Sequence, residues 1–334
     1  MRETLLSSFM PIKAKPTVVD LFSGAGLLSH AFVAEGFQVL RAVEFNPIAA
    51  ETYRLNLGDH VEVADVREAH PAGRCDVLVA GPPCQGFSTL GKRDVRDSRN
   101  LLSLEVLRWA KVLKPEIVVV ENVAAFLESP VWGRLASGLR RVGYTVHAAS
   151  YNAYDFGAPQ IRHRSLTVAS RGGSLPVSRW RRTGTVTVRE AWSGLPARPD
   201  GRNHHYAPRP SPFALARMRL IPAGGDKRDI MRRAPKLAAP SWWRVPGDVT
   251  DVWGRMEWER PSNTLRTALL NPSKGRYIHP EQHRVISLRE AARLHTIPDR
   301  WVFAGWPTHV AMQIGNSVPP ALGRAVARSV RAGL

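Results

Sequence analysis

Cysteine is almost absent from the chain, since only Cys75 and Cys84 occur among 334 residues. Two thiols cannot build a disulfide framework or a cysteine-rich zinc site, which excludes the folds that depend on either. We expect both thiols to be reduced, as in a bacterial-type cytoplasm, so either of them is available for chemistry.

Long apolar runs are also missing. No stretch of about 18 apolar residues occurs, which argues against a membrane span. The N-terminal sequence MRETLLSSFMPIKAK has a short apolar patch and no small-residue cleavage site, which argues against a secretory signal. With 44% hydrophobic and 22% charged residues the composition is that of a globular protein, long enough for one large domain and a smaller one.

Acidic residues are scarce in the second half of the chain. Residues 1–150 contain 17 Lys and Arg against 16 Asp and Glu, whereas residues 151–334 contain 30 against 12. A polyanion partner explains this asymmetry, because cationic side chains release condensed counterions from phosphates. The alternative is a GC-rich genome, which raises the arginine content everywhere, and the near-neutral first half argues against it.

The first half alternates between strand-like and helix-like segments. Strand-like runs are at Thr17–Phe22, Gln38–Glu44, Asp76–Gly81, Glu116–Val123 and Tyr144–Tyr151, and helical patterns at Leu28–Glu35, Pro47–Asn56, Leu101–Leu113 and Val131–Arg141. This alternation predicts parallel strands with crossover helices, which is a doubly wound α/β sheet. Residues 171–255, with 17 basic and 6 acidic residues, predict a smaller, irregular module. Helical periodicity returns at Leu288–Leu294 and Pro320–Ala332.

Glycines follow the first predicted strand, in the turn Asp20–Gly26. Such glycines let the backbone turn tightly and approach a nucleotide-like ligand. Glu44, at the end of the next strand, is placed to accept hydrogen bonds from ribose hydroxyls, and Asp65 could bind an adenine amino group. Dehydrogenases also carry such a turn, so this segment leaves a nicotinamide oxidoreductase open.

Cys84 follows two prolines at the end of a buried strand, in Gly81-Pro82-Pro83-Cys84-Gln85-Gly86-Phe87-Ser88. Ligands of open α/β sheets bind at the carboxyl ends of the strands. A thiol there can act as a nucleophile if cations or helix amides lower its pKa. Cys75, which leads into the strand, is interpreted as structural.

Two further segments carry candidate acid and cationic groups. Glu121 ends a buried strand, where partial burial would raise its pKa and suit it to acid catalysis. The segment Gln160–Arg164 opens another strand, so alternation places Arg162 and Arg164 on one face with Gln160. Two guanidinium groups on one face suit an anion or a carbonyl oxygen, or form a solvated edge.

Taken in order, the motifs DLFSGAG, GPPCQGFS, ENV, QIRHR and GNSVPP resemble those of the DNA cytosine-5 methyltransferase family, of bacterial restriction-modification type. They extend from Asp20 to Pro320. RPSNTL at 260–265, HPEQ at 279–282 and REAARL at 289–294 match the stretch that precedes the last motif.

The resemblance implies a catalytic role for four residues. Cys84 would add to C6 of a cytosine, Glu121 would protonate the ring at N3, and Arg164 with Arg162 would hold O2. Because C5 is a poor nucleophile until C6 is saturated, the covalent step makes transfer of the methyl group feasible. The cofactor implied is S-adenosyl-L-methionine, with no metal; the positions matching its contacts are Phe22, Gly24, Gly26, Glu44, Asp65, Pro83, Leu102, Asn316 and Ser317.

The resemblance also implies a substrate and a domain organisation. The substrate would be double-stranded DNA with its target base flipped out, and the loop with Lys92, Arg93 and Arg96 would close over it. The domains expected are a catalytic domain at 1–195, completed by 315–334, a target-recognition domain at 196–285 and a hinge at 286–314. Within them, residues 196–258 would contact the major groove. We expect a cytoplasmic monomer, with a cognate restriction endonuclease as a further candidate partner.

Leu27 departs from the family pattern, which has a second glycine after Gly26. This departure leaves open a reshaped cofactor site, and with it a DNA-binding homologue of impaired activity. A transfer RNA cytosine-5 methyltransferase is the other alternative, because one branch of the family uses the same Pro-Pro-Cys site on RNA.

Overall fold

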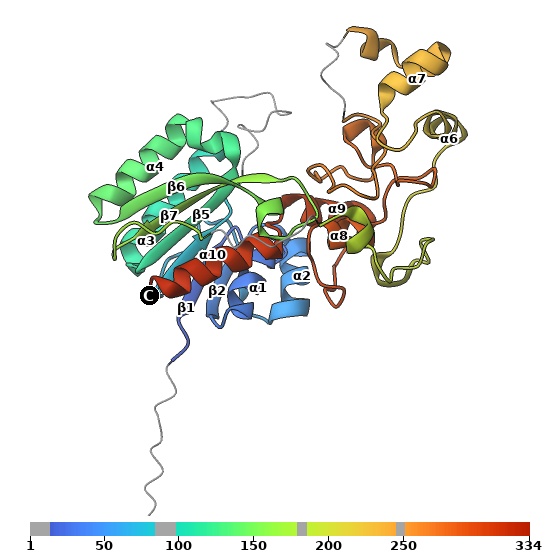
Figure 1. Ribbon diagram of the computed structural model, residues 1–334. Helices are drawn as coiled ribbons and strands as arrows, with labels where there is room; N and C mark the ends of the chain where they lie inside the picture. Colours follow the sequence, from blue (N-terminus) through green and yellow to red (C-terminus); the bar gives the residue numbers. More distant parts are fainter. Residues whose placement is uncertain (1–13, 84–97, 179–185, 245–250) are drawn as a thin grey trace, which may run out of the picture.

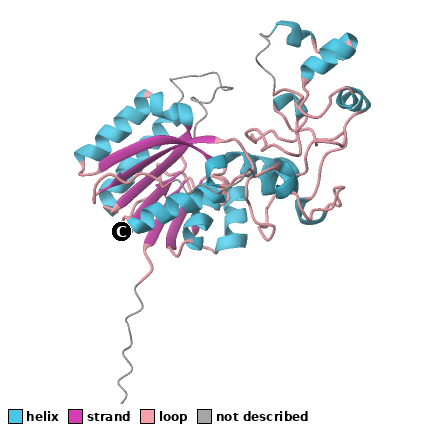
Figure 2. Cartoon of the chain, viewed as in Figure 1, coloured by secondary structure: helices cyan, strands magenta, loops and turns pink. Residues whose placement is uncertain are grey.

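A computed structural model describes residues 14–83, 98–178, 186–244 and 251–334, with the backbone alone at 98–100. Figure 1 shows two lobes: a sheet flanked by helices and, beside it, a lobe of short helices and loops. The described residues of the second lobe contain no strand (Figure 2). The predicted architecture, a doubly wound sheet with a smaller irregular domain, is confirmed. None of the described helices is long and apolar enough to cross a membrane.

A seven-stranded sheet forms the first lobe. Its strands are β1 (Thr17–Leu21), β2 (Gln38–Glu44), β3 (Val61–Val63), β4 (Val77–Ala80), β5 (Ile117–Val123), β6 (Thr145–Asn152) and β7 (His163–Ser170). They lie in the order β3-β2-β1-β4-β5-β7-β6. The strands from β3 to β5 are parallel, and β7 is antiparallel to both β5 and β6. Valine-rich β4 and β5 are buried along their length, as is typical of central strands covered on both faces.

Helices cover both faces of this sheet. They are α1 (Leu27–Ala34), α2 (Pro47–Leu57), α3 (Glu105–Leu113), α4 (Pro130–Arg141) and α10 (Pro320–Ala332), with 3-10 helices at Ser98–Leu104, Ala124–Glu128 and Ala153–Phe156. The hydrophobic cluster on one face includes residues of α1 and α10, and that on the other includes residues of α3 and α4. Asn46 and Ser129 cap α2 and α4, and a proline follows each cap, which explains where both helices begin.

The second lobe consists of short helices around one hydrophobic cluster. Its helices are α5 (Val188–Ala191), α6 (Pro212–Arg219), α7 (Lys227–Arg233), α8 (Leu288–Leu294) and α9 (Pro307–Asn316), with 3-10 helices at Arg202–His204, Pro235–Leu237, Pro240–Arg244 and Pro272–Lys274. The cluster draws its side chains from segments between Val188 and Ile314, and it also includes Leu27 of α1. One core therefore joins α5, α8 and α9 to the loops that separate them.

Buried arginines tie the loops of this lobe together. Arg255 is 2% exposed, and its guanidinium donates hydrogen bonds of 2.6–2.8 Å to main-chain carbonyls. These carbonyls belong to Met218, Ile221, His279 and Gln282. Burial lowers the pKa of Arg255 to about 10. Arginine offers five donors, so it satisfies carbonyl groups that no strand or helix partner reaches. Other arginines that bind carbonyls in this way are Arg276, Arg289 and Arg293.

His279 makes the stability of the second lobe dependent on pH. Its ring stacks on Trp192, and its Nδ1 accepts the main-chain N–H groups of Glu281 and Gln282. Burial lowers its pKa from 6.5 to about 4. The folded protein keeps the ring neutral while the unfolded chain protonates it near pH 6.5, so acid favours unfolding. We predict that this residue alone lowers the free energy of unfolding by roughly 3 kcal/mol between pH 6.5 and pH 4.

Chemical denaturation across that pH window tests the prediction. A His279→Gln variant should be less stable at neutral pH, because it loses the stacking, yet its unfolding free energy should fall less steeply with acid. A His70→Gln variant, changed at an exposed histidine, should keep the slope of the parent protein. Equal slopes for His279→Gln and the parent would contradict the assignment.

Candidate active site

Five of the predicted site residues lie at the carboxyl edge of the sheet. Because β1, β2 and β4 are parallel, Gly24, Glu44 and Pro83, which follow or end them, reach the same edge. Glu121 lies toward the carboxyl end of β5, which runs in the same direction. The antiparallel β7 begins where the others end, so Arg164 reaches this edge as well. Open α/β sheets bind their ligands at such an edge.

Glu121 and Arg164 form an ion pair, with Arg164 Nε 3.0 Å from Glu121 Oε1. Glu121 is only 7% exposed, and burial raises the pKa of its carboxyl, while the positive charges of Arg164 and Arg162 act against this shift. A buried carboxyl with a raised pKa holds a proton more readily than an exposed one does. The pair can therefore present an acid whose orientation is fixed by a guanidinium.

Asn122 links the end of β5 to the proline turn. Its Nδ2 donates to the carbonyl of Pro82 at 3.2 Å, and its Oδ1 accepts the N–H of Val123 at 2.8 Å. These bonds fix the backbone that leads into Cys84 relative to Glu121. Asn122 was not predicted as a site residue, although its position next to Glu121 in the sequence could have indicated a role in the site. Cys84 itself, and Lys92, Arg93 and Arg96 of the predicted loop, lie outside the described residues.

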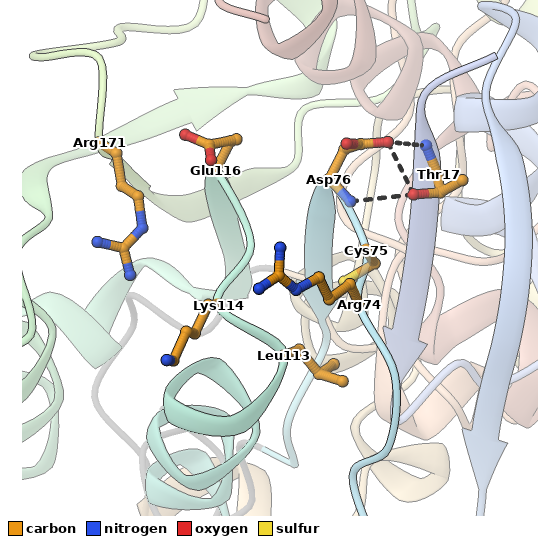
Figure 3. A pocket seen from close by; sticks show the side chains of 8 residues that line it. All are labelled: Thr17, Arg74, Cys75, Asp76, Leu113, Lys114, Glu116 and Arg171. Carbon is orange, nitrogen blue, oxygen red and sulfur yellow. Dashed lines mark hydrogen bonds between the residues drawn. The ribbon is translucent and has the colours of Figure 1, made fainter. Parts of the chain in front are cut away.

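Cys75 lies at the opposite edge of the sheet. It lines a cavity of about 430 Å³ together with Arg74, Asp76, Lys114 and other residues near the amino ends of β1, β4 and β5 (Figure 3). The side chain is buried, and burial raises the pKa of its thiol to about 12. A thiol of this pKa is almost wholly protonated at neutral pH, and it is a poor nucleophile. These properties support the structural interpretation of Cys75.

The turn after β1 has an unusual backbone. Phe22, Gly24 and Gly26 all have positive φ, of 57°, 56° and 85°. A Cβ on Gly26 would lie 2.7 Å from the ring of Tyr53. Position 26 therefore requires glycine both for its positive φ and for lack of space. A Cβ on Gly24 would meet none of the described residues within 4 Å. The turn is therefore packed on α2 at Gly26 and open beside Gly24.

Glu44 binds the backbone of this turn through its carboxylate. Its Oε2 accepts the N–H of Gly24 at 2.8 Å, and its Oε1 accepts that of Asn46 at 2.7 Å. Phe45, the next residue, is 73% exposed. An exposed aromatic ring beside a carboxylate at a strand end offers a flat surface on which a base could stack. Phe45 was missed from the sequence, where only its position after Glu44 could have indicated it.

Two buried oxygens beside the turn lack a hydrogen-bond partner among the described residues: Asp20 Oδ1 and Ser23 Oγ. The other oxygen of Asp20 accepts the hydroxyl of Ser29 at 2.5 Å, and burial raises the pKa of Asp20 to about 7. A buried polar atom without a partner is costly unless a ligand satisfies it. Together with the open side of Gly24, these oxygens fit a ligand that carries amino or hydroxyl donors.

The remaining predicted cofactor residues differ in their surroundings. The carboxylate of Asp65, after β3, is bound by the main chain and guanidinium of Arg67, which lowers its pKa. Leu102 is half-buried in the 3-10 helix that precedes α3. Asn316 ends α9 and is exposed, and Ser317 follows it. No group of three or more His, Cys, Asp or Glu side chains suited to a metal ion occurs among the described residues.

Arg162 and Arg164 share a face, as alternation predicts, since Ile161 and His163 are exposed between and beside them. Their guanidinium groups have different partners, however. Arg162 is fully buried, and it donates at 2.7–3.1 Å to main-chain carbonyls of the second lobe and of the segment after α9. These carbonyls belong to Leu265, Gly315 and Ser317.

Gln160 and His295 complete this buried junction. Gln160 Nε2 lies 3.0 Å from His295 Nδ1, and His295 Nε2 lies 2.9 Å from the carbonyl of Ser317. Burial lowers the pKa of His295 well below its usual value, so the ring is neutral. The predicted cofactor segment at Asn316–Ser317 is therefore held by side chains from the segment before β7 and from the residue that follows α8.

The fold and site together define a class. A doubly wound sheet with an antiparallel β7 between β5 and β6 has at its carboxyl edge a glycine turn, a proline turn and a buried Glu–Arg pair. The chain belongs to the C-5 cytosine-specific DNA methylase family, whose model matches residues 16–190 and 230–332. It is accordingly a DNA (cytosine-5-)-methyltransferase, as its motifs predicted.

Known proteins resemble the chain over almost its whole length. The type II methyltransferase M1.HphI of Haemophilus parahaemolyticus is 33% identical over 97% of this chain and 89% of its own. The type II methylase M.HgiDII of Herpetosiphon aurantiacus is 32% identical over 94% of each. A candidate DNA modification methyltransferase encoded within an E. coli prophage has a solved structure that covers 95% of this chain and 99% of its own, with a TM-score of 0.68 and 26% identity.

Proposed function

We propose that the protein transfers a methyl group from S-adenosyl-L-methionine to C5 of a flipped-out cytosine within a short DNA sequence. The observation that carries the proposal is the buried Glu121–Arg164 pair at the carboxyl edge, joined through Asn122 to the turn that precedes Cys84. This arrangement sets an oriented acid beside the proline turn that leads into Cys84, the proposed nucleophile. The nicotinamide oxidoreductase that the glycine turn leaves open does not account for this pair or for Cys84.

The reaction would proceed through a covalent adduct at Cys84. The thiolate adds to C6 of cytosine while Glu121 gives a proton to N3, so the charge pushed into the ring is neutralised. Arg164 keeps Glu121 in place and donates to O2. C5, now nucleophilic, takes the methyl group that the sulfonium of S-adenosyl-L-methionine supplies. A water molecule then takes the C5 proton, and the C6–S bond breaks with its electron pair going to sulfur. N3 returns its proton to Glu121, which restores the aromatic ring, the thiolate and the acid.

Residues of the glycine turn and its neighbours would hold the cofactor. Glu44 suits the ribose hydroxyls, Phe45 the face of the adenine, and Asp20 Oδ1 an amino group that needs a buried acceptor. The other proposed contacts are Phe22, Gly24, Gly26, Asp65, Pro83, Leu102, Asn316 and Ser317. Arg162, bound to the carbonyls of Gly315 and Ser317, would keep the last two in position.

The DNA would lie between the two lobes, with residues 1–195 and 315–334 as the catalytic domain, 196–285 as the recognition domain and 286–314 as the hinge. Extrusion of the base costs a few kcal/mol of stacking, which contacts to phosphates would offset. We further propose a monomeric enzyme that acts on DNA in a bacterial cytoplasm. A cognate restriction endonuclease is proposed as a further partner, since two relatives are named type II methyltransferase and type II methylase.

The recognition segment carries a testable prediction. The family model leaves residues 191–229 unmatched between its two parts, as expected where relatives read different sequences. Exchanging residues 196–258 for the corresponding segment of a relative should move methylation to that relative's target. A swap of α4, at 130–141 on the face of the sheet opposite α1 and α10, should leave the target unchanged. An unaltered target after the 196–258 exchange would place recognition elsewhere.

Bisulfite sequencing of plasmid DNA from cells that express the protein tests the whole proposal. We expect cytosines within a recurring short sequence to be protected from bisulfite conversion. The same cytosines should be converted in cells that express a Cys84→Ala variant. Absence of protection with a folded protein would contradict DNA methylation. Methylated transfer RNA in the same cells would then favour the RNA-modifying alternative, and DNA binding without methyl transfer would favour an impaired homologue.

A further inference from the structure

Two adjacent leucines at the start of α1 enter different cores. Leu27 is 1% exposed and belongs to the cluster of the second lobe, with Trp301 and Ile314. Leu28, 7% exposed, belongs instead to the cluster between the sheet and α10. Leu27 is therefore the residue of α1 that joins the core of the second lobe.

A ring contact strengthens the same junction. His30, three residues after Leu27 and on the same side of α1, meets Trp301 edge to face at a centroid distance of 5.0 Å. Trp301 is itself fully buried. The first turn of α1 thus lies directly against the second lobe.

Leu27 also connects two parts of the cofactor site. It follows Gly26 immediately, so any movement of its backbone moves the glycine turn. It shares its cluster with Ile314 of α9, which ends two residues later at Asn316. Glu44 and Tyr53 hold the turn from the side of β2 and α2, whereas Leu27 packs into the cluster to which Ile314 of α9 belongs.

We propose that Leu27 is a positioning residue for S-adenosyl-L-methionine, which holds the glycine turn at a set distance from Asn316–Ser317. The inference rests on the proposed function, because it assumes that the cofactor lies between these two segments. A glycine at this position, as the family pattern has it, would lack the contact. The leucine therefore adds a connection between the lobes. The sequence left open an impaired site at Leu27, and we propose instead that the site requires this leucine.

The test compares Leu27→Ala with Leu28→Ala. Both remove the same atoms from a buried position of one helix, so both should lower the melting temperature. By calorimetric titration, Leu27→Ala should raise the Kd for S-adenosyl-L-methionine about tenfold, and Leu28→Ala by less than about twofold. The kcat at saturating cofactor should change little in either. Leu27→Met, of similar volume, should restore the parent affinity.

Equal changes in Kd for the two alanine variants would overturn the proposal and reduce Leu27 to an ordinary core residue. Should either alanine variant be recovered unfolded, the milder pair Leu27→Val and Leu28→Val gives the same comparison. A parent protein that is folded and does not bind S-adenosyl-L-methionine would contradict the proposed function instead. The two failures are thereby distinguished.

Discussion

Replacing Cys84 by serine is expected to lower the rate of methyl transfer by about ten-thousand-fold or more. The thiolate supplies the nucleophile that saturates C6, and a serine hydroxyl is not ionised at neutral pH. Transfer of tritium from labelled S-adenosyl-L-methionine to DNA measures the rate. Gel-shift assays should show that the variant binds DNA as the parent does.

Cys75→Ala is the matched control, because it removes the other thiol of the chain. Cys75 lies at the opposite edge of the sheet with a thiol pKa of about 12, so its loss should leave the rate within about twofold at temperatures where the variant is folded. A fully active Cys84→Ser enzyme would rule out the covalent mechanism. A folded but inactive Cys75→Ala enzyme would show that the wrong cysteine was assigned.

Glu121→Gln should lower kcat by roughly a hundredfold to ten-thousandfold, with the KM for S-adenosyl-L-methionine nearly unchanged. Glutamine keeps the shape of the side chain, yet it cannot give a proton to N3. Because burial raises the pKa of Glu121, the parent enzyme should lose activity as pH rises through that pKa and the acid ionises. The residual activity of the variant should lack this step.

Glu116→Gln serves as its control, since Glu116 precedes β5 at the amino edge, at the other end of the same strand. Its replacement should leave kcat and the pH profile unaltered. The assignment of Glu121 as the acid fails if Glu121→Gln retains most of the parent kcat, or if both variants lose it equally.

Local patterns were sufficient to predict most of the strands of the sheet. Valine-rich runs at β4 and β5 are strands on any reading, because each must be buried on both faces between helices of clear periodicity. The direction of β7 could not be predicted in this way, since a strand has the same local pattern in either direction. The signal was the absence of a crossover helix: only a 3-10 turn, Ala153–Phe156, lies between β6 and β7.

The site was predictable in part. Motif spacing brings Glu121 and Arg164 to one edge, and their 3.0 Å contact follows from the pairing of β5 with β7. Arg162 has the same pattern and the same face, yet its partners Leu265 and Gly315 are more than 100 residues away in the chain. A pattern of alternating residues carries no information about such partners. The helix α9 was not predicted either. Its apolar residues Val310, Ala311 and Ile314 pack against side chains that are distant in the sequence.

The arginines that bind carbonyls inside the second lobe limit what can be redesigned there. A library that randomises the basic residues of 196–285 would treat Arg255 and Arg276 as candidate contacts to bases, although each is a structural crosslink. Lysine cannot replace them, because one ammonium lacks the planar fork that reaches several carbonyls at once. The number of phosphates deduced from a salt titration should likewise fall short of the number of arginines in the sequence. Selections for a new target will succeed by varying the exposed basic residues around an arginine framework that is left intact.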